Sequence, residues 1–138
     1  MTLAFLLDTN VVSELRKKVP NPLVDEWSDR HGSADFFISS LVVGEVRSGV
    51  EKLRPRDPER AAQLERWLGT LIEEFRDRIL PVTTEVAAEW GRIHASIGGP
   101  PIDNLMAATA SVHRLTLATR NVADVSRTGV PVVNPFDG

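Results

Sequence analysis

Several features are missing from this chain of 138 residues, and each absence narrows what the protein can be. It has no cysteine, which excludes disulfide bonds and thiolate ligands, so any metal must be held by oxygen or imidazole. Long apolar runs are missing too. The run from Leu3 to Leu7 stops at Asp8 and follows no basic leader, so it is too short for a signal peptide or a membrane span. We therefore expect a cytoplasmic protein.

An excess of positive charge is also missing, because the formal net charge is −3. A protein that binds nucleic acid by phosphate attraction alone carries a strongly basic surface. If the substrate is a polyanion, local groups of cations must bind it, although any single one of them is better explained as solvated surface. The candidates form two stretches, Arg16, Lys17 and Lys18 in the first, and Arg47, Lys52, Arg54 and Arg56 in the second.

Familiar motifs of other enzyme classes are absent as well. The histidines, His31, His94 and His113, show no metal-ligand spacing, and the chain has no Walker loop, HExxH pair or nucleophile elbow. We assign the histidines no chemistry.

What is present is a globular composition, with 42% hydrophobic and 25% charged residues. A chain of this length forms one compact core, and no repeat or linker divides it, so we expect a single domain over residues 1–138. Apolar segments at 3–7, 35–38, 79–82, 116–118 and 130–133 predict strands. Helical spacing lies between most of them, and a polar turn is predicted at 119–124. This alternation predicts an α/β fold with a mainly parallel sheet flanked by helices.

Asp8 directly follows the first predicted strand, which should be central in the sheet. Ligands of open parallel sheets bind at the carboxyl ends of the strands, so the location suggests a functional site. The alternative is that Asp8 or Asn10 only caps the next helix. One residue does not decide between them.

Other acidic residues have similar alternatives. Glu45 lies about 60° from Val42 on a helical wheel, beside the buried stripe, yet a solvated glutamate would fit there as well. Asp103 opens a helix and could act only as its cap, although Ala107 and Ala110 below it would allow close packing towards the first strand. Asp124 lies in a segment where Asn and Asp are ordinary turn residues.

Taken together, four short motifs change this interpretation. In their order and spacing they resemble the PIN-domain nucleases, and more closely the VapC-type toxins of toxin–antitoxin pairs. The resemblance runs from the first strand to Asn134-Pro135-Phe136, nearly the whole chain. The motifs are Leu7-Asp8-Thr9-Asn10, Val42-Val43-Gly44-Glu45-Val46, the segment from Ile102-Asp103-Asn104 to Ala110, and Thr119-Arg120-Asn121-Val122-Ala123-Asp124.

The resemblance implies a PIN-like, Rossmann-like domain of three layers. It also implies that Asp8, Glu45 and Asp103 form the acidic core of an Mg²⁺ or Mn²⁺ site. Many relatives carry an acid where this chain has Asn121, so either Asp124 or the Asn121 amide completes the site. Hydroxyls near the motifs, Thr9 and Ser39, are candidate helpers that bind ligands or phosphate.

Clustered carboxylates raise one another's pKa values, so such a site is unfavourable until a cation neutralises it. Oxygen ligands favour hard cations, and such an ion can activate water for attack on phosphorus. We therefore predict hydrolysis of phosphodiesters. The resemblance implies RNA as the substrate, usually a structured RNA of the translation machinery.

The resemblance also implies a homodimer and an antitoxin of VapB type, which carries a DNA-binding portion and blocks the acidic pocket. A groove for an amphipathic helix of that partner is predicted at Val11, Leu15, Trp67 and Leu71, unless these side chains only pack on the sheet. The alternative function is a catalytically weak or inactive PIN-fold binding module, which the amide at Asn121 would favour. An aspartyl phosphatase would need a second Asp at Asn10, and a receiver domain would need a lysine at Arg120, so both fit less well.

Overall fold

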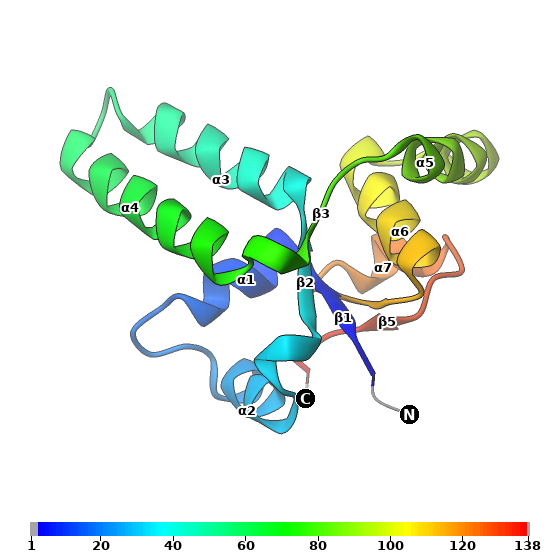
Figure 1. Ribbon diagram of the computed structural model, residues 1–138, viewed down its shortest axis with the longest axis horizontal. Helices are drawn as coiled ribbons and strands as arrows, with labels where there is room; N and C mark the ends of the chain where they lie inside the picture. Colours follow the sequence, from blue (N-terminus) through cyan, green and yellow to red (C-terminus); the bar gives the residue numbers. More distant parts are fainter. Residues whose placement is uncertain (1–2, 138) are drawn as a thin grey trace.

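The computed structural model describes residues 3–137 and shows a parallel sheet between two groups of helices (Figure 1). The strands follow the order β3-β2-β1-β4-β5, and the four pairings between them are parallel. The predicted α/β class and parallel sheet are therefore confirmed, and the first strand is central. The strands are β1 (Phe5–Leu7), β2 (Phe36–Ser39), β3 (Ile79–Leu80), β4 (Thr116–Ala118) and β5 (Val132–Val133).

The helices connect the strands and form the two outer layers. In Figure 1, α1 to α4 lie on one side of the sheet and α5 to α7 on the other. They are α1 (Thr9–Leu15), α2 (Pro22–Arg30), α3 (Ser40–Leu53), α4 (Pro58–Glu74), α5 (Thr84–Ile97), α6 (Pro101–His113) and α7 (Val122–Ser126). Single turns of 3₁₀-helix precede β2 and β3, at Ser33–Asp35 and Arg76–Arg78.

Local sequence signals explain where these helices begin. The Asp8 carboxylate accepts a hydrogen bond from the Thr9 backbone N–H at 2.8 Å, and the Ser39 hydroxyl accepts one from Leu41 at 3.1 Å. Pro58 and Pro101 occupy first-turn positions, where the missing N–H costs nothing. The predicted helix starts are thus confirmed to within a residue or two.

Three predictions about the later part of the chain are wrong in detail. The last strand begins at Val132 rather than Val130, because Pro131 has no N–H for the ladder. The third strand ends at Leu80 rather than Val82, because Pro81 has no N–H to continue the ladder. The segment predicted as a polar turn at 119–124 contains the start of helix α7, where the Asn121 carbonyl accepts a hydrogen bond from Val125. Val125 is buried, so packing of this apolar side chain favours the helix over an open turn.

The core lies on both faces of β1, whose side chains are almost fully buried. On one face it meets the buried stripe of α3, and on the other it meets the small side chains of α6. Ala107 and Ala110 have no exposed surface, so α6 approaches the sheet closely and its first turn lies near the end of β1. A second cluster, around Val86, Ile93 and Ala108, joins α5 to α6.

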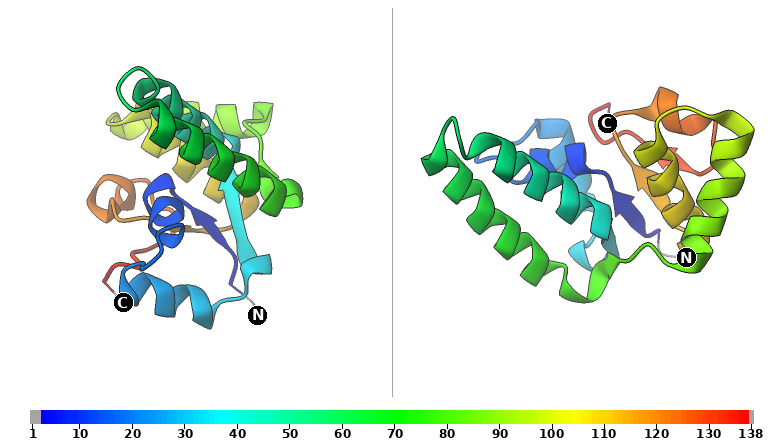
Figure 2. Two further views of the ribbon diagram at one scale, coloured as in Figure 1. Left: turned by 90° about the vertical axis from the view of Figure 1, so that its left-hand side faces the viewer. Right: turned by 90° about the horizontal axis from the view of Figure 1, so that it is seen from above.

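The antiparallel pair α3 and α4 extends beyond the sheet as a hairpin (Figures 1 and 2). Gly49 lies where the two helices meet, and a Cβ there would lie 3.7 Å from the Leu64 side chain. No helix among residues 3–137 is both long and apolar enough to cross a membrane.

Candidate active site

Asp8 stands at the carboxyl end of the central strand, where it is only 7% exposed. One carboxylate oxygen caps α1 through Thr9, as the capping interpretation required. The other accepts hydrogen bonds from the Thr119 hydroxyl at 2.6 Å and the Asn10 side-chain amide at 3.3 Å. Capping therefore uses one oxygen of Asp8, and the second belongs to a polar network at the edge of the sheet.

The Thr119 hydroxyl lies at the centre of this network. Thr119 follows β4 and is fully buried, and its hydroxyl also accepts hydrogen bonds from the Asn121 backbone N–H at 3.0 Å and the Asn10 amide at 3.4 Å. Because β2 and β3 lie on one side of β1 while β4 and β5 lie on the other, the strand order reverses at β1, which is where open α/β sheets bind ligands. Sequence reasoning placed Thr119 only in a turn. Its position directly after a strand was the signal for a role beside Asp8.

Glu45 reaches the same edge from α3. It is exposed, and its carboxylate accepts a hydrogen bond from the Thr9 hydroxyl at 2.6 Å. This bond joins two residues 36 positions apart and fixes the first turn of α1 against α3. The structure thus places Thr9 and Glu45 together, as a pair beside Asp8.

Asp103 lies in the first turn of α6 and is partly exposed. The cap position of this helix belongs to Pro100, which makes no side-chain capping bond. Burial, and then the negative charges of Asp8, Asp124 and Glu45, raise the pKa of Asp103 above its usual range. The fold therefore gathers carboxylates from β1, α3, α6 and α7 closely enough for their charges to interact.

The loop before Asp103 is held in place by the neighbouring residue. Asn104 is fully buried, and its side-chain nitrogen lies 2.7 Å from the Gly98 carbonyl and 2.9 Å from His94 Nδ1. Because a carbonyl only accepts, this atom must be the amide nitrogen, so His94 Nδ1 accepts and its proton lies on Nε2. The Trp90 indole N–H donates to the Pro101 carbonyl at 3.1 Å. These bonds tie the start of α6 to α5 and so position Asp103.

The fourth corner of the site comes from α7 and the residue before it. Asp124 and Asn121 are both exposed. The Asn121 backbone N–H donates to the Thr119 hydroxyl, but the Asn121 side chain makes no capping bond. Of these two residues, only Asp124 carries a charge that raises the pKa of Asp103. Ser39 ends β2, the strand beside β1, and its fully buried hydroxyl caps α3.

The gathered groups are oxygen donors throughout, which suits a hard divalent cation such as Mg²⁺ or Mn²⁺. Within residues 3–137, however, no three Asp, Glu or His side chains lie at metal-ligand spacing. Like charges keep apart without a cation between them, so this spacing agrees with the raised pKa of Asp103. The donor set fits a metal ion that would draw the side chains inwards.

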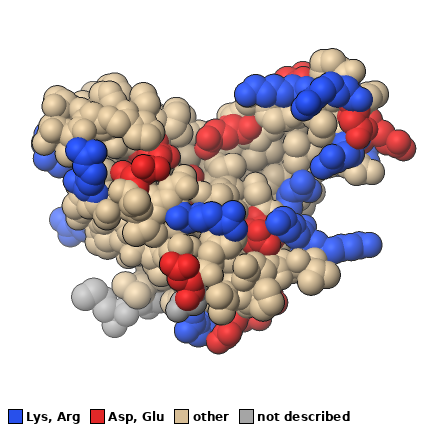
Figure 3. Space-filling view, turned by 180° about the vertical axis from the view of Figure 1, so that it is seen from behind, with Lys and Arg blue, Asp and Glu red and all other residues tan. Residues whose placement is uncertain are grey.

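Several of the cations predicted to bind the substrate form ion pairs with acidic side chains of the chain itself. Arg47 and Arg54 both bond to Glu65 of α4 and to Glu51, so their charges are matched within the hairpin. Lys17 pairs with Glu14 at 2.9 Å. Figure 3 shows the molecule from behind. Lys and Arg gather mostly on the side that carries the α3–α4 hairpin, and acidic side chains lie beside the hollow between the hairpin and the part formed by α5 and α6.

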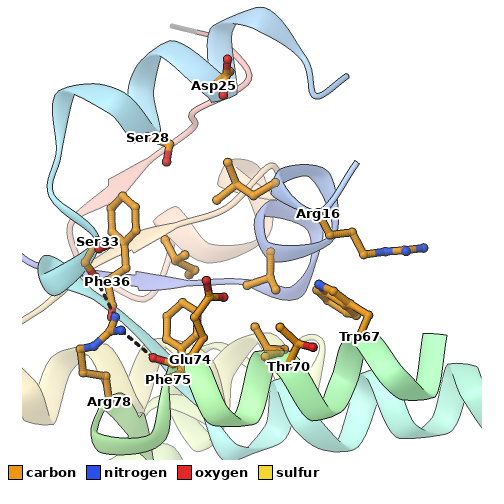
Figure 4. A pocket seen from close by; sticks show the side chains of 14 residues that line it. Arg16, Asp25, Ser28, Ser33, Phe36, Trp67, Thr70, Glu74, Phe75 and Arg78 are labelled. Atoms are coloured by element: carbon orange, nitrogen blue, oxygen red, sulfur yellow. Dashed lines mark hydrogen bonds between the residues drawn. The ribbon is translucent and has the colours of Figure 1, made fainter. Parts of the chain in front are cut away.

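The predicted groove is present but differs by one residue. A cavity of about 480 Å³ lies between α1, α2 and α4, where Leu15, Trp67 and Leu71 line it (Figure 4). Val12 takes the place predicted for Val11, which is fully buried and does not line the cavity. The error has a simple cause, because neighbouring residues of a helix point about 100° apart.

Comparisons with known proteins agree on one family. The PIN domain model matches residues 5–129. Toxin FitB of Neisseria gonorrhoeae is 37% identical over 136 residues, which cover 95% of this chain and 97% of that protein. VapC ribonuclease Y4jK of Sinorhizobium fredii is 29% identical over 137 residues, 96% of this chain and 97% of that protein. The crystal structure of FitAcB from Neisseria gonorrhoeae superposes with a TM-score of 0.85 at 35% identity, covering 96% and 98% of the two chains.

Proposed function

Because this chain belongs to the PIN domain family, we propose that it is an Mg²⁺- or Mn²⁺-dependent endoribonuclease and the toxin of a toxin–antitoxin pair. We further propose that residues 1–138 form one PIN domain and that it acts in the cytoplasm, on RNA of the translation machinery. A relative named as a ribonuclease, and relatives named as a toxin and a plasmid stability protein, support this assignment.

One observation carries the proposal. Carboxylates from four separate segments lie near one another at the switch point of the sheet, where burial, and then the charges of the other three, raise the pKa of Asp103. A fold gains nothing in stability from such an arrangement, so a bound cation is its natural explanation. In our proposal Asp8, Glu45, Asp103 and Asp124 hold the metal ion.

A bound divalent ion would activate a water molecule for attack on the phosphodiester and stabilise charge on the leaving oxygen. The chain's own residues prepare the site for that ion. Thr119 and Asn10 fix the direction of the Asp8 carboxylate, and Thr9 holds Glu45 towards it. The Asn104 contacts hold the turn that carries Asp103. The Asn121 amide, near Asp124, would complete the site by a hydrogen bond to substrate. Ser39, at the end of the neighbouring strand β2, fixes the start of α3, which carries Glu45.

A protein partner fits the same assignment. Similar structures include FitAB bound to a DNA fragment, and VapBC of Salmonella typhimurium bound to DNA. We propose that a VapB-type antitoxin lays an amphipathic helix into the groove of Leu15, Trp67 and Leu71, and that it carries the DNA contact. A homodimer of this chain would then present two such toxins to one antitoxin pair.

The decisive experiment is cleavage of a labelled RNA pool by the purified chain, with Mg²⁺, Mn²⁺ or a chelator. We expect cleavage with either ion, none with the chelator, and a loss of at least about 100-fold in Asp8→Asn. Asp29→Asn removes an exposed carboxylate of α2 and should cleave like the wild type. Activity that survives both chelation and Asp8→Asn would refute the proposal.

The second candidate is a binding module that keeps the fold without effective catalysis. The specific observation in its favour is the exposed amide of Asn121, at a position where the family resemblance implies an acid. Tight binding of an antitoxin by a wild-type chain that cleaves no RNA with either metal would favour this alternative.

A further inference from the structure

A second hollow opens directly beside the Thr9–Glu45 pair. Its volume is about 280 Å³, and it lies between α1, α3 and α4, where it shares only Arg16 and Trp67 with the larger groove. It is therefore continuous with the acidic edge of the sheet yet distinct from the groove. The lining residues are Thr9, Ser13, Arg16, Lys17, Glu45, Val46, Gly49, Leu64 and Trp67.

The hollow carries a cation, Arg16, that forms no ion pair within the described residues, whereas Lys17 and Arg47 near it are paired. Arg16 is exposed, and it makes no salt bridge with any residue in the described range 3–137. The neighbouring cations are engaged, since Lys17 pairs with Glu14, and Arg47 pairs with Glu51 and Glu65. Arg16 thus offers an unmatched positive charge next to a group of carboxylates, which is where the phosphate of an incoming strand needs one.

One wall of the hollow is aromatic and apolar. Trp67 of α4 is partly exposed, and Leu64 and Val46 continue the surface towards Glu45. The Arg16 guanidinium lies 5.2 Å from the centre of the Trp67 ring (Figure 4). Proteins bind single-stranded nucleic acid with aromatic and cationic side chains placed together in this way, since a base stacks on a ring and a cation takes the phosphate.

Gly49 lines the hollow from α3. A Cβ at this position would meet Leu64 at 3.7 Å, an ordinary contact, so the packing of α3 on α4 does not require glycine. Gly49 also has no positive φ, whereas glycine inside a helix lowers stability relative to alanine. The residue therefore lowers helix stability and leaves open space at the hollow.

We propose that this hollow binds one nucleotide of a single-stranded RNA segment, next to the phosphodiester that is cleaved. The base lies against Trp67 and Leu64, and Arg16 pairs with the adjoining phosphate. The volume of about 280 Å³ lies just below the range of about 300–1,000 Å³ for ligand pockets, which suits one nucleotide better than a base pair. This inference rests on the proposed ribonuclease function and adds a subsite to it.

The test measures equilibrium binding of a labelled, mixed-sequence single-stranded RNA oligonucleotide in the nuclease-inactive Asp8→Asn background. We expect Trp67→Leu to weaken binding by about 5- to 100-fold, because a stacking contact is lost. Arg16→Gln should weaken binding and lower the salt slope by about 1, because one phosphate contact is lost. Trp67→Phe and Arg16→Lys should restore most of the affinity. A duplex of the same sequence should bind more weakly and respond little to Trp67→Leu.

The matched control for Arg16→Gln is Lys18→Gln, which removes an equal charge two residues away and outside the hollow. The thermal midpoint of each variant establishes that it is folded. Gly49→Leu places a side chain into the space without touching charge, and it should weaken RNA binding as Trp67→Leu does. Gly49→Ala adds only the tolerated Cβ and should bind as before.

Equal effects of Arg16→Gln and Lys18→Gln, or unchanged binding in both Trp67→Leu and Gly49→Leu, would overturn the subsite while leaving the ribonuclease function standing. A loss of antitoxin binding in Gly49→Leu, which lies outside the antitoxin groove, with RNA binding intact would also overturn it, and would assign the hollow to the protein partner. If the wild type neither binds nor cleaves RNA, the proposed function itself fails.

Discussion

The acidic edge of the sheet and the α3–α4 hairpin use the same residue types in opposite ways. In the hairpin, Arg47 and Arg54 alternate with Glu51 and Glu65, and each carboxylate bonds to both arginines at 2.6 to 3.3 Å. At the sheet edge, Asp103 meets only negative charges among the causes of its raised pKa.

The difference shows in the direction of the pKa shifts. Hydrogen bonds from the arginines hold the pKa values of Glu51 and Glu65 below their usual range, so these carboxylates are stabilised by the folded protein. Asp103 shifts the other way, because burial and three neighbouring acids oppose its charge. In the hairpin, paired opposite charges join α3 to α4. At the sheet edge, like charges lie near one another, and a bound cation would relieve their repulsion.

The largest effect that would test this contrast concerns the hydroxyl behind Asp8. Thr119→Val removes the 2.6 Å bond to Asp8 but keeps a similar volume, so the carboxylate loses its fixed direction. We expect metal affinity, measured by calorimetry, to fall by about 10- to 100-fold. Thr119→Ser keeps the hydroxyl and should bind metal nearly as the wild type does. Unchanged affinity in Thr119→Val would make the bond structural only.

A smaller effect is expected from Asp103→Asn, which removes one like charge from the acidic edge. In a chelator the variant should melt about 1 to 4 °C higher than the wild type. The folded pKa of Asp103 is raised, so its ionisation lowers stability as the pH rises, and the advantage of Asn should vanish below the usual value of 3.8. Added Mg²⁺ should raise the melting temperature of the wild type more than that of the variant. A variant that melts lower at neutral pH would contradict the repulsion.

Glu89 extends the comparison, because its partners are an arginine, as in the hairpin, and a hydroxyl, as at Asp8. It accepts hydrogen bonds from Arg92 and from the Ser111 hydroxyl, which lower its pKa to about 2. This carboxylate therefore stabilises the fold above about pH 4.5, and the contribution is lost as the pH falls towards 2. In urea at about pH 7, Glu89→Gln should lose on the order of 1 kcal/mol, discounted for partial exposure. The loss should shrink towards pH 3, and a loss independent of pH would exclude the ionic explanation.

The smallest effect should come from the hairpin. Glu65→Gln removes a partner of Arg47 and Arg54, yet these side chains are 41 to 46% exposed and screened by water. We expect the melting temperature to fall by no more than about 2 °C. The difference should disappear in about 1 M salt, where screening acts over about 3 Å. A larger fall that resists salt would mean that the network is a structural requirement.

Much of this fold follows from local patterns in the sequence. The strand after Leu3, the caps at Asp8 and Ser39, and the breaks at the prolines were all predictable, because hydrophobic periodicity and capping act over a few residues. The placement of Asp8 at the end of a central strand followed from the same patterns. The acids that share an edge could be proposed only because four motifs resembled a known family.

Other features depend on contacts between distant segments. The sequence alone determined most of the elements and their order, although not helix α7, along with the absence of thiolate ligands. Only the tertiary structure decided that Thr119 meets Asp8 across 111 positions, and that Glu65 neutralises Arg47 while Arg16 stays unmatched. It also decided that Val12, rather than Val11, faces the groove. The physical reason is that local propensities act between near neighbours, whereas a hydroxyl or a counter-ion acts on whatever the packing of the sheet brings within about 3 Å.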